Sequence, residues 1–97
     1  MKLICKALCG TTTWHINEAF ILIEEDTYDY NDHSDKYRCY THIKKSKIEE
    51  ISFTTPRTDR QGAISLCSGK NIHTIIYSQN QENEAYAFYI ELMRTLS

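Results

Sequence analysis

The chain has four cysteines and four histidines, which could act as metal ligands or as a nucleophile and its base. Cys5 and Cys9 are separated by three residues, whereas Cys39 and Cys67 stand apart. A structural zinc site presents two closely spaced ligand pairs, and only one loose pair is present. Cysteines inside apolar strands pack as small hydrophobic side chains. We therefore expect no metal and no cofactor.

Cys39 and His42 are the nearest approach to a nucleophile with its base. Three residues apart on a strand, the two side chains point to opposite faces. The chain has no Gly-rich phosphate loop, Gly-x-Ser-x-Gly turn or His-Glu-x-x-His helix. We therefore expect a protein that is not an enzyme.

Seven tyrosines are the main compositional feature of the chain. Tyr28 and Tyr30 lie in its most polar window, beside aspartates rather than apolar residues. Exposed tyrosines anchor protein interfaces, which makes these two candidate binding residues. They could equally pair across a hairpin with Tyr37 or Tyr40 and stiffen it, and the sequence leaves both interpretations open.

Within the same polar window, the spacing Asp29-x-Asn31-x-His33-x-Asp35 suggests a calcium loop that begins at Asp29. The EF-hand pattern requires Gly at its sixth position and Glu at its twelfth, where this chain has Ser34 and Tyr40. Turn-forming Asp and Asn at a hairpin tip explain these residues without a metal.

Charge is unevenly distributed along the chain. Residues 17–35 carry seven acids and no Lys or Arg, whereas residues 36–60 carry seven bases, ending in Arg57 and Arg60, against three acids. Adjacent antiparallel strands could pair these opposite charges. Alternatively, the two stretches form a two-sided surface for self-association or partner steering. The net charge of -2 disfavours nucleic acid as a partner.

Six or seven short strands followed by one helix position these side chains. Hydrophobic alternation, β-propensity and turn residues place the strands at residues 2–8, 13–16, 19–23, 37–43, 48–53, 63–67 and 72–77. A two-residue turn is expected at Asn17-Glu18, and Pro56 ends the fifth strand.

The last element has helical periodicity. Its apolar stripe recurs every three or four residues, and Met93 flanks it; the stripe is Ala85, Phe88, Tyr89, Leu92 and Leu96. Ser78 with Gln81, or Asn80 alone, is the expected N-terminal cap.

Ninety-seven residues suffice for one domain, residues 1–97. The chain has no apolar segment that reads as a signal peptide or a membrane span, so we expect a cytoplasmic protein that does not bind membranes. Its thiols are then reduced, although the even number of cysteines also admits a disulfide framework.

Residues 10–96 resemble short bacterial pleckstrin-homology-like domains. The resemblance rests on Ile43-x4-Ile48-x2-Ile51-x-Phe53-x2-Pro56, then Gly62-Ala63-Ile64-x-Leu66, a turn at Gly69, the strand 72–77 and the helical stripe. It implies two roughly orthogonal antiparallel sheets, with the helix plugging one end. Members that bind phosphoinositides carry Lys or Arg between their first two strands. This chain has Cys9-Gly10-Thr11-Thr12 there, so phosphoinositide binding is not expected.

Together these features predict a non-enzymatic binding or assembly module. Its contacts with a protein partner, or with further copies of itself, would involve Tyr28, Tyr30, Arg57 and Arg60. The alternative is a small stand-alone inhibitor of a host enzyme, or a protein that sequesters a nucleotide-like small molecule, as phage counter-defence proteins do.

Overall fold

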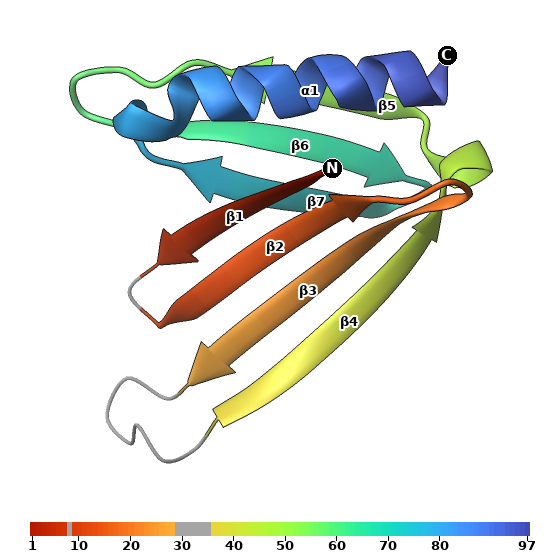
Figure 1. Ribbon diagram of the computed structural model, residues 1–97, viewed down its shortest axis with the longest axis horizontal. Coiled ribbons are helices and arrows are strands. Elements are labelled where there is room, and N and C mark those ends of the chain that lie inside the picture. The colour runs from red at the N-terminus through yellow and green to blue at the C-terminus, as the bar shows by residue number, and fades with distance from the viewer. Residues whose placement is uncertain (8, 29–35) are drawn as a thin grey trace.

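The computed structural model describes residues 1–7, 9–28 and 36–97, which form two antiparallel sheets and a C-terminal helix (Figure 1). The first sheet has the strand order β1 (Lys2–Ala7), β2 (Gly10–Ile16), β3 (Phe20–Tyr28), β4 (Lys36–Lys44). The second has the order β5 (Glu50–Thr54), β6 (Gly62–Ser68), β7 (Asn71–Tyr77). Two short 3₁₀ turns, η1 (Lys45–Lys47) and η2 (Gln79–Gln81), precede β5 and the helix α1 (Glu82–Leu96). The expected mainly β architecture with one C-terminal helix is confirmed.

The first sheet buries one face because its apolar residues alternate with polar ones. Trp14 is paired with Leu3 on one side and Ile23 on the other, and directly paired residues share a face. All three are buried.

The second sheet and α1 close the core over that face. The helical stripe packs inward as its spacing predicts, except that Tyr89 and Leu96 lie at the edge of the core, half-buried. The buried side chains from this half are Ile64, Leu66, Ile75, Tyr77, Ala85, Phe88 and Leu92.

Tyr77 ties β5 to the core. Its ring lies directly over Gly62, where a Cβ atom would be 2.2 Å from the ring carbon Cζ. The hydroxyl donates a hydrogen bond to the carbonyl oxygen of Thr54 at 2.8 Å. Gly62 therefore leaves the space through which a buried tyrosine reaches the backbone of the edge strand.

Two of the local predictions are wrong. The turn between β2 and β3 lies at Glu18-Ala19, because Asn17 N donates to Phe20 O at 3.0 Å and closes a two-residue loop. The helix has no side-chain cap; its N-cap residue is Gln81. The Ser78 hydroxyl instead bonds the side chains of Asn80 and Gln81, and η2 occupies the backbone N–H of Gln81.

β3 also runs farther than hydrophobicity predicts, through Asp26 to Tyr28. Its polar end is held by cross-strand partners: Asp26 pairs with Arg38 of β4, and their side chains form an ion pair at 3.5 Å. One acid of the acidic stretch is thus paired with one base of the basic stretch across the sheet.

β4 and β5 are edge strands of different sheets, joined by η1. In Figure 1, β3 and β4 extend beyond the part of the first sheet that lies near α1 and the second sheet. None of the helices in the described part of the chain is long and apolar enough to cross a membrane.

Candidate functional site

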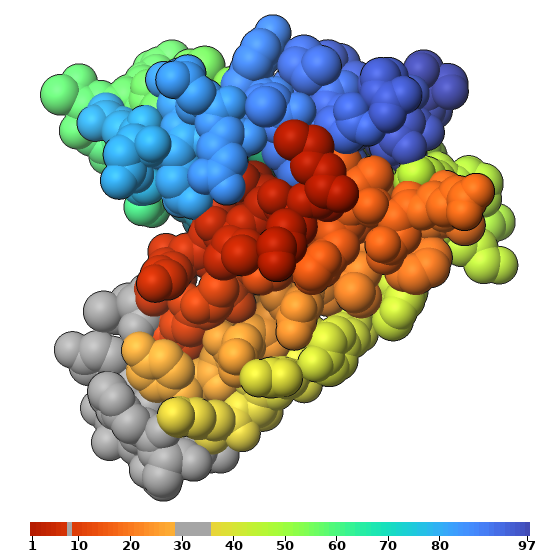
Figure 2. All heavy atoms as spheres, in the orientation of Figure 1, coloured from red at the N-terminus to blue at the C-terminus, as the bar shows by residue number. Residues whose placement is uncertain are grey.

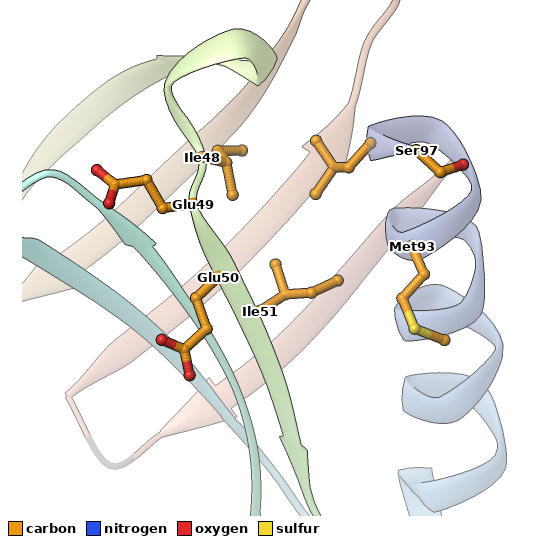
Figure 3. A pocket seen from close by; sticks show the side chains of 7 residues that line it. Ile48, Glu49, Glu50, Ile51, Met93 and Ser97 are labelled. Carbon is orange, nitrogen blue, oxygen red and sulfur yellow. The ribbon is translucent and has the colours of Figure 1, made fainter.

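An apolar groove separates β5 from the C-terminal turn of α1 (Figure 3). Its volume is about 410 Å³. The residues that line it are Ile48, Glu49, Glu50, Ile51, Met93, Leu96 and Ser97. The groove is therefore built from two segments more than forty residues apart in the chain.

The strand side of the groove has its apolar side chains toward α1 and its acidic ones away from it. Ile51 points toward α1, whereas Glu49 and Glu50 point away from the helix (Figure 3). The carboxylate of Glu49 accepts a hydrogen bond from Gly69 N at 3.0 Å, which holds it over the β6–β7 turn. The apolar wall is consequently open toward the helix, with the acids on its other side.

The helix side consists of Met93 and Leu96, which lie outside the fully buried stripe. Met93 is 38% exposed, although a methionine at this position could have packed into the core. Lys45 Nζ donates to Thr95 Oγ1 at 2.5 Å and links η1 to the last helical turn. A cation there also interacts favourably with the helix dipole.

An aromatic cluster continues the groove along the same seam. The ring of Phe53 lies 5.6 Å from that of Tyr77, 5.5 Å from Tyr86 and 5.2 Å from Tyr89, measured between centroids. Tyr86 is 52% exposed. Phe53, Tyr86 and Tyr89 give the seam between β5 and α1 a rigid apolar surface of the kind that anchors protein interfaces.

β5 has an open edge beside this surface. It pairs with β6 on one side, and no described strand pairs with it on the other. An edge strand presents unpaired N–H and C=O groups that can accept a further strand. The site therefore combines backbone hydrogen-bonding groups with an adjacent apolar groove.

Arg57 and Arg60 lie elsewhere, at the turn between β5 and β6. The structure brings these two together: Arg57 N donates to Arg60 O at 2.9 Å, and Arg60 N to Arg57 O at 3.3 Å. Both are exposed and line a shallow pocket of about 320 Å³ with Ser78 and Gln79. Gln79 Nε2 donates to Arg57 O at 3.2 Å, so the turn is held against η2.

Tyr28 is the half-buried last residue of β3, in the other sheet, and Tyr30 lies outside the described residues. Tyr28 is opposite Lys36. Tyr37 and Tyr40 are opposite Thr27 and Glu24, so neither is the direct cross-strand partner of Tyr28. The tyrosine pair and the arginine pair thus belong to different sheets.

The sequence places the groove residues on a strand and a helix but does not identify them as a site. The available signal was Met93, an apolar side chain beside the helical stripe rather than within it. Ile48 was a second signal, because it precedes the alternating pair Ile51 and Phe53 by an odd number of positions. Neither signal identifies the opposite wall.

The cysteines do not pair as disulfides. All four are free thiols. Burial, with a smaller contribution from Glu84, raises the pKa of Cys5 to about 11, so it stays protonated at neutral pH. Cys39 is exposed, contrary to the expected burial, because no described element covers this part of the edge strand β4. Among the described residues no three His, Cys, Asp or Glu side chains cluster as metal ligands would.

A smaller, polar pocket of about 220 Å³ lies between β2, β3 and β7. Trp14 lines it together with Thr12, Glu25, His73 and Thr74, and with two isoleucines. The indole N–H of Trp14 is out of contact with solvent and has no hydrogen-bond partner. The pocket thus offers a carboxylate, an imidazole and two hydroxyls beside a buried indole.

Comparison of the chain with protein-family models, curated proteins and solved structures found no match. The geometry of the molecule is therefore the basis for assigning it a function.

Proposed function

We propose that this chain is a non-enzymatic, pleckstrin-homology-like binding module that binds an extended segment of a partner protein between β5 and α1. Two antiparallel sheets of four and three strands with a C-terminal helix support the comparison with that fold. The observation that carries the function is the open edge of β5 beside the apolar groove.

Strand addition explains how both features would be used together. The backbone of the incoming segment forms hydrogen bonds with β5, and alternate side chains enter the groove, so affinity and specificity have separate sources. β5 has five residues, about 17 Å of strand, which matches a segment of about five residues. So small an interface favours a weak, reversible complex.

Charge defines the partner segment further. Side chains on one face of the added strand face the apolar wall of Ile51 and Met93. Those on the other face lie on the side of Glu50 and Ser52, which are exposed. The matching segment therefore alternates apolar and basic residues, since a basic side chain is complementary to Glu50.

Titration with designed peptides tests this proposal. The probes are a nine-residue peptide of alternating Val and Lys and its counterpart of alternating Val and Glu. We expect the Val/Lys peptide to shift the backbone amide resonances of β5 and of the last turn of α1. No shift there with either peptide would overturn the proposed site.

A matched pair of helix variants provides the control. Met93→Glu places a carboxylate in the groove, whereas Ile90→Glu changes a side chain of almost equal exposure, 38% against 39%, outside it. We expect Met93→Glu to weaken Val/Lys binding at least about tenfold, a change of about 1.4 kcal/mol, and Ile90→Glu to leave it unchanged. Equal effects would refute the groove. A concentration-dependent dimer that Met93→Glu abolishes would assign the groove to a second copy instead.

The polar pocket beside Trp14 supports a second candidate function, the sequestration of a small polar molecule. Native mass spectrometry of protein purified from its own host is the test. A retained small-molecule mass that His73→Ala and Glu25→Ala release would favour sequestration. A clean polypeptide mass would count against it.

A further inference from the structure

β4 is a second open edge, and its chemistry differs from that of β5. The strand is nine residues long, about 30 Å, and most of it is exposed. No described strand pairs with it on the side away from β3. In Figures 1 and 2 it runs along the outer margin of the four-stranded sheet.

The hydrogen-bonding pattern shows which backbone N–H and C=O groups of β4 point away from β3. Lys45 N donates to Ala19 O at 3.1 Å, and Asn17 N to Phe20 O at 3.0 Å. In an antiparallel pair, every second residue of a strand forms its backbone hydrogen bonds with a given neighbour. The first bond shows that the odd-numbered residues of β4 form theirs with β3. The second agrees, because it shows that the even-numbered residues of β3 bond to β2 instead. The even-numbered residues 36–44 therefore present their N–H and C=O groups at the free edge.

The side chains of these same residues form one basic and aromatic row. Alternation places them together on the sheet face that lies away from the core; they are Lys36, Arg38, Tyr40, His42 and Lys44. Tyr40 is 52% exposed, and the His42 ring lies 5.1 Å from that of Phe20. The row thus lies directly beside the position that an added strand would occupy.

We propose that the free edge of β4 binds an extended acidic segment of a partner protein by strand addition. Alternate acidic side chains of that segment would lie beside the basic row of β4. Strands are spaced about 4.8 Å apart, so the added strand lies about 10 Å from Glu24 and Asp26 of β3. At physiological salt this backbone separation exceeds the screening length of about 8 Å, while the Asp26 carboxylate itself stays paired with Arg38 at 3.5 Å.

A second copy of the chain and a nucleic acid are each less compatible with the free edge of β4 than an acidic segment. An antiparallel pair of β4 strands centred on Tyr40 would place Lys36 opposite Lys44 of the second copy and Arg38 opposite its His42. Like charges directly opposite one another destabilise a sheet. A nucleic acid strand lying across the face would meet Glu24 and Asp26, which lie between the basic row and β2.

This site is independent of the proposed groove. β4 and β5 belong to different sheets, and the two sites prefer segments of opposite charge. Binding at β4 can therefore fail while binding at β5 succeeds, and the reverse.

The probe is the same nine-residue peptide of alternating Val and Glu, with the Val/Lys peptide as its charge-reversed counterpart. We expect the Val/Glu peptide to shift the amide resonances of Arg38, Tyr40 and His42 and to bind more weakly as salt is added. Equal binding of the two peptides at β4 would overturn the proposal.

Substitutions at Tyr40 separate the backbone from the side chain. Tyr40→Pro removes an N–H at the free edge without removing a bond to β3, whereas Tyr40→Val retains the N–H. We expect Tyr40→Pro to weaken Val/Glu binding at least about tenfold and Tyr40→Val to change it less than about threefold. Arg38→Glu should also reduce affinity at least about tenfold, because it reverses a charge within the row.

The peptide itself provides the test if Tyr40→Pro fails to fold. A Val/Glu peptide with N-methyl groups along one edge cannot donate to β4 from that edge. Unchanged affinity of peptides methylated on either edge would contradict strand addition. A dimer that Tyr40→Pro dissociates, or an oligothymidine that displaces the peptide from β4, would reassign the edge to a second copy or to nucleic acid.

Discussion

Replacing Gly62 by Ala is expected to displace the buried ring of Tyr77. The added Cβ would lie 2.2 Å from Cζ, 2.4 Å from the hydroxyl oxygen and 2.6 Å from Cε2. Ordinary van der Waals contact begins near 3.4 Å, so the ring must move by about 1 Å. Because Tyr77 is fully buried and its ring is stacked with that of Phe53, it cannot move without disturbing the core.

The expected cost has two parts. Forcing one extra carbon into a packed core costs about 1–3 kcal/mol. Losing the hydrogen bond from Tyr77 to the carbonyl of Thr54 costs about 0.5–1.5 kcal/mol more. The free energy of unfolding should therefore fall by about 1.5–4.5 kcal/mol. In a domain of this size that lowers the melting temperature by at least about 6 °C.

Urea denaturation followed by circular dichroism measures this change, and Gly69→Ala is the control. Gly69 has a φ of 63° and open space around its Cβ position, so only backbone strain, about 1 kcal/mol, is expected there. In a Tyr77→Leu background, Gly62→Ala should cost less than about 1 kcal/mol, because the ring it strikes is gone. Equal costs of Gly62→Ala in the two backgrounds would refute the steric argument.

Four further measurements test individual side chains of the structure. Tyr77→Phe should lower the free energy of unfolding by about 1 kcal/mol, since only the bond to Thr54 is lost; no change in urea denaturation would contradict this. Burial raises the pKa of Cys5 from 9.0 to about 11, so the unfolded chain releases that proton first. Between pH 9 and 11 the wild type should therefore lose stability relative to Cys5→Ala, and parallel pH curves would contradict the assignment. A thiol reagent should label Cys39 in the native protein and Cys5 only after unfolding, as peptide mass spectrometry can show. The emission of Trp14, the single tryptophan, should shift to longer wavelength on unfolding, because its indole is fully buried.

The order of the strands and the position of the helix could be predicted because their signals are local. Alternation identified the strand around Trp14, and the spacing from Ala85 to Leu92 identified the buried face of α1. The boundaries were predictable only where a residue with a fixed backbone preference marked them. Pro56, for example, follows the end of β5.

Local signals failed where a distant partner decides the outcome. The polar end of β3 is a strand because Arg38 of β4 lies opposite Asp26. Cys39 is exposed because no described element covers the part of β4 around it, which its own neighbours in the sequence do not reveal. The helix lacks its expected cap because Ser78 bonds to side chains rather than to the backbone.

The sequence by itself determined which residues are apolar, which face of each strand and of the helix they occupy, and that acids precede bases along the chain. These properties depend on periods of two and about 3.6 residues, which are local to each element. Only the tertiary structure decided that Ile48 and Ile51 lie across a groove from Met93, and that no described strand pairs with the outer edges of β4 and β5. A groove is formed by two separate elements, and a strand is an edge strand only when no other strand pairs with one of its sides. Both depend on how the sheets and the helix pack in three dimensions, and the periodicity of a single element carries no record of that packing.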